Sequence, residues 1–304
     1  MITKKIAITG STGLIGTALV EKLLKDGHNV LQLTRGNHLK EDVLWDPENE
    51  WFKENIFEGI DVLINLSGHT IGGRLTNKIK NKVYSSRIDI TNLLIKEISK
   101  YSKKPKQIIN ASATGYYGNR YNEEINEQST SGFGFLSEVP NEWEKAANQG
   151  SKYGIKIATT RFGLVLSKDG GFLNKPIIAG LSLLKLFQLG IAGKLGNGKQ
   201  WMPWISLEDT TRAIAFIINH ELDGPINIVG PTPTTNYEFT KTLGGLIKRP
   251  TIIPIPALPL KIIFGEFAKD GLLGGQKVSP KVLLNNGFKY NHETIEQALI
   301  QVIK

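Results

Sequence analysis

The sequence predicts an α/β fold: a doubly wound parallel sheet followed by a smaller C-terminal lobe. Over the first 170 residues, short β-branched runs alternate with helical patterns, which is typical of a parallel sheet covered by helices. Beyond residue 170, glycine, tryptophan and proline-rich loops become more frequent. We therefore expect a core over residues 1–170, with core strands allowed to continue to about residue 230. A smaller substrate lobe is expected over residues 171–304, with a ligand site between the two parts.

The first strand is expected at Lys5–Thr9, a buried run that leads into a glycine-rich turn. The next helix carries Ile15, Leu19 and Leu23 at fourfold spacing, and Gly27 ends it. Five more strands of the core follow the same alternation, and the second of these five is short. These expected strands are Asn29–Thr34, Val43–Trp45, Asp61–Leu66, Gln107–Ala111 and Lys156–Leu166.

Helices are expected at Ser86–Ser99 and Glu138–Gly150 within the core. In the second part, two capping-box patterns mark helix starts, and a final amphipathic pattern predicts a closing helix. The two helix starts are Ser206 with Asp209 and Thr235 with Glu238, and the closing helix has Ile295, Leu299 and Val302 on one face. A further strand is expected at Ile226–Val229.

The composition excludes several classes of site. The chain of 304 residues has no cysteine, which excludes disulfides, thiolate zinc sites, iron–sulfur clusters and cysteine nucleophiles. Its five histidines show no paired helical spacing, so we expect no metal. The net charge of +9 comes from dispersed lysines, which favours solvated helix faces over a nucleic-acid stripe.

No stretch of about 18 uninterrupted apolar residues is present, and the first residues do not resemble a signal peptide. These observations predict a cytoplasmic protein with no membrane partner and no nucleic-acid partner. A small-molecule substrate is expected, and a homodimer is left open.

A glycine-rich turn gives the strongest functional signal. Gly10, Gly13 and Gly16 lie in ITGSTGLIG, directly after a predicted strand and at the start of a predicted helix. This context is that of a dinucleotide fingerprint. Gly10 permits the tight turn, Gly13 lets backbone amides approach a pyrophosphate, and Gly16 lets helix and strand pack closely. A glycine-rich turn without a ligand is the alternative.

The end of the second strand indicates which dinucleotide binds. NAD binding usually needs a carboxylate there, whereas NADP needs a cation for its 2′-phosphate. The strand NVLQLTR ends in Thr34 and Arg35 with no acid nearby, and the arginine fork binds phosphate through two hydrogen bonds. An exposed loop arginine is the alternative. NADP is therefore preferred over NAD.

Together these features resemble the extended short-chain dehydrogenase/reductase superfamily. More narrowly, the chain is similar to the atypical branch of epimerase family proteins with a C-terminal domain of undefined role, here residues 231–300. The resemblance implies a Rossmann core, a small substrate lobe and an NADP cofactor. Its further motifs are DVLINLSG, SSRIDIT, NASATGYYG, FLSEVPNEWE, RFGLVLSKDGG, LGNGKQWMPWISLED and GQKVSPKVLLNNGF.

The resemblance also implies cofactor contacts by position. Arg87 stands where ordinary members of the superfamily have an asparagine, and Leu164 matches a position beside the nicotinamide. The implied contacts are Gly10, Ser11, Thr12, Gly13, Leu14, Ile15, Gly16, Thr34, Arg35, Leu66, Ser67, Gly68, Arg87 and Leu164.

The catalytic residues depart from the superfamily pattern. That pattern has a serine that holds the reacting oxygen, a tyrosine acid/base, and a lysine four residues later that lowers the tyrosine pKa. Ser112 matches the serine, but Leu136 and Pro140 stand at the tyrosine and lysine positions. Tyr116 and Tyr117 lie close to Ser112 in sequence, and each could serve as acid/base or pack against a ring.

On the substrate side, Arg161 is expected to clamp an anion or to be a strand-end charge. Arg74, Trp201 and Trp204 are candidates to line the substrate site, with lobe core as the alternative for the tryptophans. The function expected is an NADP-dependent epimerase, dehydratase or reductase acting on a small polar substrate such as a nucleotide-linked sugar. A non-catalytic NADP-binding scaffold or redox sensor is the alternative, which the missing tyrosine–lysine pair favours.

Overall fold

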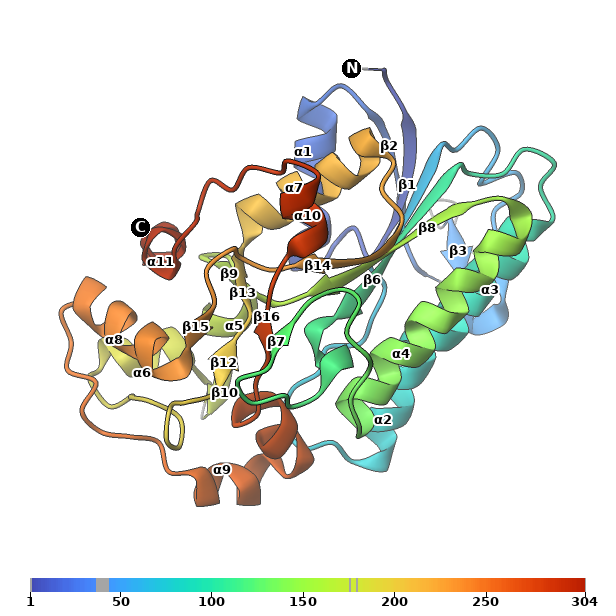
Figure 1. Cartoon of the computed structure of the whole chain (residues 1–304). Helices are drawn as coiled ribbons and strands as arrows, with labels where there is room; N and C mark the ends of the chain where they lie inside the picture. The colour runs from blue at the N-terminus through green and yellow to red at the C-terminus, as the bar shows by residue number, and fades with distance from the viewer. Residues whose placement is uncertain (1, 37–43, 175, 179, 304) are drawn as a thin grey trace.

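A six-stranded parallel sheet forms the centre of the molecule, in the strand order β14-β8-β6-β5-β1-β2 (Figure 1). The computed structural model describes residues 2–36, 44–174, 176–178 and 180–303. The strands of the sheet are short, and all except the edge strand β2 are largely buried, as expected where helices cover both faces. The strands are β1 (Lys5–Thr9), β2 (Asn29–Leu33), β5 (Val62–Asn65), β6 (Gln107–Ala113), β8 (Lys156–Phe162) and β14 (Gly224–Ile228).

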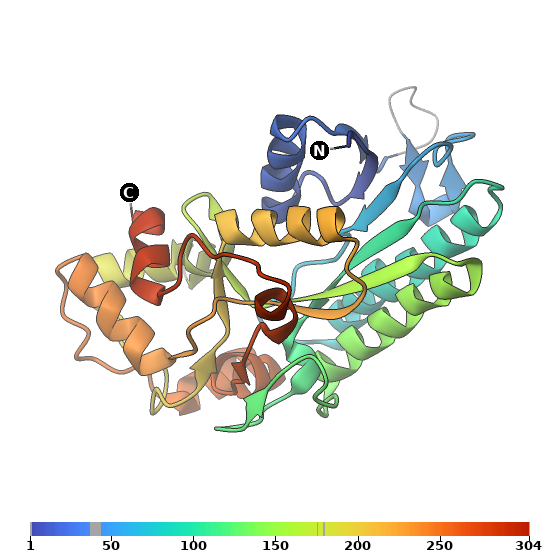
Figure 2. The same ribbon diagram turned by 45° about the horizontal axis from the view of Figure 1, so that its top comes forward.

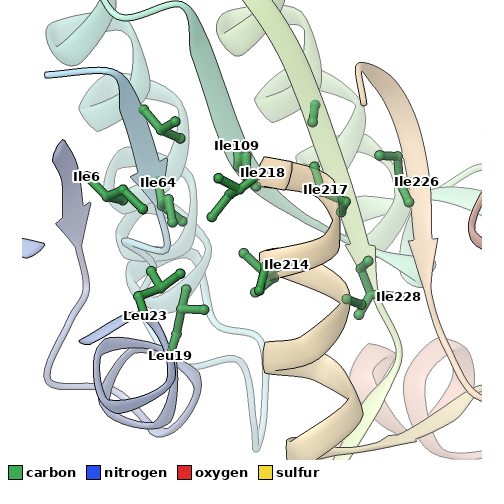
Figure 3. Packing of buried hydrophobic residues seen from close by; sticks show 14 of the residues in the cluster. Ile6, Leu19, Leu23, Ile64, Ile109, Ile214, Ile217, Ile218, Ile226 and Ile228 are labelled. Carbon is green, nitrogen blue, oxygen red and sulfur yellow. The ribbon is translucent and has the colours of Figure 1, made fainter. Parts of the chain in front are cut away.

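Alternate residues of the strands supply two separate cores, because successive side chains point to opposite faces of a sheet. Ile6 and Ile64 pack with helices α1 and α7 on one face (Figure 3), whereas Ala7 and Leu63 pack with α3 on the other. The fold is therefore the Rossmann-like, three-layer α/β arrangement that the sequence predicts. The core helices are α1 (Leu14–Lys25), α2 (Asn77–Tyr84), α3 (Ile90–Ser99), α4 (Phe135–Asn148) and α7 (Leu207–His220).

The strand expected at Lys156–Leu166 is two strands. β8 ends at Phe162, Gly163 interrupts it, and β9 (Leu164–Ser167) pairs in parallel with β13 (Trp204–Ser206) outside the main sheet. A Cβ at position 163 would overlap the carbonyl oxygen of Pro203. The backbone crossing there requires glycine, and it separates the two strands.

The helix expected at Ser86–Ser99 also differs from the structure. Regular α-helix begins only at Ile90, and Ser85–Asp89 forms a π-helical turn that joins α2 to α3. π-helical turns occur frequently at functional sites, and this one carries Arg87. The helix expected from Glu138 begins one turn earlier, at Phe135, directly after Gly134 with φ +90°.

Other expectations are confirmed with small shifts in their bounds. β1 has its expected bounds, and β6 continues two residues further, to Ala113. The expected strand Val43–Trp45 begins outside the described residues. The structure has β3 (Trp45–Asp46) there, paired with β4 (Trp51–Phe52).

A smaller lobe, largely orange in Figure 2, lies to one side of the sheet. Its core includes Phe187, Phe239 and Leu299. Two elements that also follow residue 170 lie outside the lobe: β14 is a strand of the main sheet, and α7 packs on that sheet. Its helices and short strands are α5 (Gly171–Asn174), β10 (Pro176–Ile178), β11 (Leu181–Ser182), α6 (Leu183–Gln188), β12 (Trp201–Met202), β15 (Thr234–Thr235), α8 (Asn236–Leu246), α9 (Ala257–Phe264) and α11 (Ile295–Ile303).

The last part of the chain also returns to the core. β16 (Lys277–Val278) pairs with β7 (Glu124–Ile125), and α10 (Lys281–Asn285) packs beside β14. Among the described residues, no helix is both long enough and apolar enough to cross a bilayer.

Two helix caps confirm the sequence signals. Thr235 forms a complete capping box with Glu238 at the start of α8. Ser206 Oγ accepts the Asp209 N–H at 3.0 Å at the start of α7. The expected final helix is α11, and its residues Ile295, Leu299 and Val302 are buried.

Candidate cofactor-binding and active site

The glycine-rich turn joins the carboxyl end of β1 to the start of α1. Gly10 has φ +68°, and a Cβ there would lie 2.7 Å from the Leu66 carbonyl oxygen. A Cβ at Gly16 would overlap the carbonyl oxygen of Gly10. Both glycines are therefore required by packing, and the turn lies directly against the turn that follows β5.

Gly13 is different, because among the described residues a Cβ there would meet one atom within 4 Å, the Gly10 carbonyl oxygen at 3.3 Å. As the N-cap of α1 it supplies no side-chain acceptor, and the first turn of the helix contains no acidic residue. The N–H groups at a helix start need acceptors and carry partial positive charge. This uncapped end suits an anion such as a pyrophosphate.

The turn after β5 carries a buried polar side chain that lacks a hydrogen-bond partner among the described residues. Ser67 Oγ is buried and has no hydrogen-bond partner among the described residues, although buried hydroxyls are nearly always paired. Its neighbour Leu66 contacts Gly10. Two turns expected to touch the dinucleotide are thus adjacent, and both present unsatisfied polar groups.

Arg87 reaches the same turn from the π-helical segment. A Cβ at Gly68 would lie 3.1 Å from its guanidinium carbon, so the glycine admits the cation. Arg87 Nη1 donates to the His69 carbonyl at 2.9 Å, and the guanidinium stacks 5.0 Å from the Trp143 ring. Burial lowers the pKa of Arg87 to about 10, and no described carboxylate pairs with it. Such a cation suits an anionic ligand group.

The remaining cofactor candidates lie at the edges of the turn. Thr34 and Arg35 are exposed at the end of β2, next to β1. Ser11 is buried and Thr12 exposed, while the half-buried Ile15 packs on the sheet core. The last two candidates, Leu14 and Leu164, lie near β9. A Cβ at Gly171, shortly after the end of this strand, would lie 3.2 Å from Leu14. Leu164 is the first residue of β9 and pairs with Trp204.

Ser112 lies near the end of β6, buried, and donates a hydrogen bond from Oγ to Glu144 Oε1 at 2.6 Å. Glu144 comes from α4, eight residues after Leu136 and four after Pro140. Positions 136, 140 and 144 share one face of the helix, because residues four apart lie one turn above each other. The sequence reasoning missed Glu144, although this spacing from the substituted pair was a usable signal.

Arg161 has a structural role. It lies opposite Ser112 on β8 and is only 3% exposed. Its Nε and Nη2 bind the two oxygens of Glu144, each at 2.8 Å. Its Nη1 donates to the Tyr117 hydroxyl at 2.8 Å. These bonds engage all three guanidinium nitrogens, so we no longer expect Arg161 to contact the substrate.

The two tyrosines are not equivalent. Tyr117 is fully buried, donates its hydroxyl proton to Asn227 Oδ1 at 2.7 Å, and has its pKa raised to about 12 by burial. We therefore remove Tyr117 from the catalytic candidates. Tyr116 is half-buried, its ring stacks 3.6 Å from the Arg161 guanidinium, and its hydroxyl has no partner among the described residues. Tyr116 remains the candidate acid/base.

The substrate-side tryptophans also separate. Trp204 is buried in the lobe core and donates Nε1 to the Thr232 carbonyl at 3.1 Å, so the lobe-core alternative holds for it. Trp201 is half-buried, with Nε1 donating to Asn122 Oδ1 at 2.9 Å. Arg74 is exposed near Gly265, at the end of α9. Trp201 and Arg74 remain substrate-side candidates.

Comparisons with known proteins agree with this arrangement. The NAD dependent epimerase/dehydratase family model matches residues 6–229, and a domain of unknown function (DUF1731) matches residues 255–302. An epimerase family protein of Mycobacterium bovis is 38% identical over 302 residues, which cover 98% of this chain and 97% of the relative. One of Staphylococcus aureus is 34% identical over 309 residues, covering 99% of each chain.

Two solved structures extend the comparison. Human epimerase family protein SDR39U1, crystallised with NADPH, is 28% identical with a TM-score of 0.85 and 98% coverage of both chains. A nucleoside-diphosphate sugar epimerase of Corynebacterium glutamicum is 30% identical with a TM-score of 0.79, covering 99% of this chain and 58% of that one. From its sequence motifs, its sheet and these matches, the chain belongs to the NAD dependent epimerase/dehydratase family.

Proposed function

We propose that the protein is an NADP(H)-dependent epimerase, dehydratase or reductase that acts on a small polar substrate. The observation that carries the proposal is the uncapped start of α1 at Gly13, together with the exposed Arg35 and the lack of an acid at the end of the neighbouring strand β2. The NADPH in the human relative's structure supports this choice of cofactor. The name of the Corynebacterium protein supports a nucleotide-linked sugar as the substrate class.

In this proposal the α1 N–H groups hold the pyrophosphate and Arg35 binds the 2′-phosphate, with Thr34 beside it. Ser67 and Arg87 supply a hydroxyl and a cation on the neighbouring turn. Leu164 is assigned to the nicotinamide side. Bound NADP(H) would supply or accept the hydride.

The protein's own groups would orient and protonate the substrate. The Ser112 hydroxyl proton is committed to Glu144, so its free lone pairs accept a hydrogen bond from a substrate hydroxyl. Glu144 is held by Arg161 and fixes the orientation of Ser112. The Tyr116 hydroxyl, which has no hydrogen-bond partner among the described residues, is the group that moves a proton.

Cofactor choice is tested by Arg35→Ala. Loss of a charge-assisted hydrogen bond costs about 1.5–3 kcal/mol, so NADPH should bind about tenfold to a hundredfold more weakly while NADH binding is unchanged. Lys25→Ala, which removes a charge at the other end of α1, is the control. An equal loss for both cofactors would argue against a 2′-phosphate contact.

A non-catalytic NADP-binding scaffold or redox sensor is the second candidate, and Leu136 and Pro140 at the tyrosine and lysine positions favour it. The test is a screen of nucleotide sugars, ketones and aldehydes by NADPH absorbance, with product analysis for redox-neutral epimerisation. With a substrate found, Tyr116→Phe should lower turnover about 10²–10⁴-fold at unchanged NADPH affinity, whereas Tyr153→Phe should not. No turnover of any compound would favour the scaffold.

A further inference from the structure

The C-terminal lobe exposes an unusual number of large aliphatic side chains. Ile252 is 82% exposed, Leu258 68% and Ile262 65%. Monomeric soluble proteins rarely keep contiguous apolar patches of this kind without a use for them. We call this surface the aliphatic face; its members are Leu189, Ile191, Ile252, Ile253, Leu258, Ile262 and Ile263.

Two chain segments that carry Ile191, Ile252 and Ile253 lie side by side. Residues 190–196 run beside residues 250–257, with the Ile255 N–H donating to the Lys194 carbonyl and the Gly196 N–H to the Ile255 carbonyl, both at 2.9 Å. The second segment leads directly into α9, which adds Leu258, Ile262 and Ile263. In Figure 1 this segment follows the edge of the lobe from α8 to α9.

The two chain stretches that carry the aliphatic face contain cations and no acidic residue. The sequence has no acidic residue between Asp169 and Glu208, nor between Glu238 and Glu266. Exposed cations lie in these same stretches, and none of them forms an ion pair with a described residue. Glu266, the first acid after α9, is already paired with Lys80. These exposed cations are Lys185, Lys199, Lys241, Lys248, Arg249 and Lys261.

We infer that the aliphatic face docks on the surface of an anionic phospholipid bilayer. Aliphatic side chains that enter the headgroup region, flanked by cations that attract anionic lipid, are the pattern of peripheral membrane contact. Tyr237 fits the same surface: it is half-exposed, and Lys194 and Lys241 each lie 5.9 Å from its ring. Tyrosine is enriched at the headgroup level of membranes.

The same observations argue against the other occupants. A symmetric dimer through this face would bring cations of one copy near cations of the other, because a twofold interface places the same patch against itself. Side chains that are two-thirds exposed project from the surface, whereas those that line a peptide groove are more enclosed. The inference revises the sequence expectation of no membrane partner, which rested on the lack of a spanning segment. Peripheral contact needs no such segment.

The test is co-sedimentation of the full chain with vesicles of phosphatidylcholine alone and of phosphatidylcholine with phosphatidylglycerol. We expect binding to the anionic vesicles only, at least tenfold weaker for the double variant Ile262→Asp, Ile263→Asp. Leu24→Asp is the control, because Leu24 is as exposed as Ile263, 54% for each, but lies on α1. Lys248→Ala with Arg249→Ala should also weaken binding, whereas Lys25→Ala with Lys103→Ala should not.

Melting temperature and NADPH affinity of each variant check that the fold and the cofactor site are intact. These readouts also separate this inference from the proposed function, because neither should change. No binding to anionic vesicles, or equal binding by the double variant and the parent, would overturn the inference. A parent dimer that the double variant dissociates, without vesicle binding, would assign the face to a second copy instead.

Discussion

At the scale of single residues, the clearest feature is a buried polar network that the sequence pattern does not show. Ser112, Glu144, Arg161, Tyr117 and Asn227 come from five separate elements and form one chain of hydrogen bonds. In such a network each group is the partner that makes burial of the next tolerable. The network therefore holds the Ser112 side chain in position and also contributes to the stability of the folded protein.

Glu144→Ala tests this role. It leaves the Arg161 guanidinium buried without a carboxylate, and breaking a buried ion pair costs about 3–5 kcal/mol. Urea unfolding should show a loss of that size. Glu142→Ala, which removes an exposed partner of Lys145 from the same helix, should cost about 1 kcal/mol or less. Equal losses in the two variants would contradict the account.

Glu127 predicts a pH effect on stability. Its burial raises the pKa of the carboxyl above the ordinary 4.5. Because the folded state holds this proton more tightly than the unfolded state, stability falls as the pH rises from 4.5 through the folded pKa. Glu127→Gln keeps an oxygen acceptor for the Asn227 and Val282 N–H groups.

The difference in unfolding free energy between Glu127→Gln and the parent should therefore increase in favour of the variant across that pH window. Denaturant unfolding at several pH values between 4 and 7 measures it. A constant difference across the range would show that Glu127 does not titrate as inferred.

At the scale of elements, the turn between β1 and α1 combines two kinds of glycine. Gly10 and Gly16 are needed by the fold, because any side chain would meet backbone atoms. Gly13 is less constrained by the protein: among the described residues, a Cβ there would meet one backbone atom, the Gly10 carbonyl oxygen at 3.3 Å, and a shift of a few tenths of an ångström would relieve that contact. We attribute its lack of a side chain to the ligand.

Gly13→Val should therefore fold and lose NADPH binding, because the added carbons occupy the path of the pyrophosphate. Calorimetric titration with NADPH and a thermal melt are the two measurements. Gly245→Val, at an open position of α8, is the matched control and should bind normally. NADPH binding by Gly13→Val at parental affinity would place the phosphates elsewhere.

Elements set by local pattern could be predicted from the sequence, and those set by distant contacts could not. β1, the capping box at Thr235 and the buried face of α11 follow from short-range periodicity and capping chemistry. The break at Gly163 depends on the Pro203 carbonyl, 40 residues away in sequence. The structural role of Arg161 depends on Glu144 and Tyr117, which no spacing rule brings together.

At the scale of the whole molecule, the order of the chain mixes the two parts. After the first segments of the lobe, the chain returns to the core, where α7 packs on the main sheet and β14 joins it. Near the end of the chain, β16 pairs with β7 of the core. The C-terminal segment therefore packs on both the lobe and the core. This arrangement brings Gly275 of the C-terminal segment against Trp201, and Gly265, at the end of α9, beside Arg74.

The central claim is that this chain holds NADP(H) at the start of α1, with the 2′-phosphate on Arg35. Calorimetric titration of the purified parent protein with NADPH and with NADH tests it most directly. We expect one NADPH per chain, bound at least about tenfold more tightly than NADH because one charge-assisted contact distinguishes them. Equal affinities for the two cofactors, or no binding of NADPH, would contradict it.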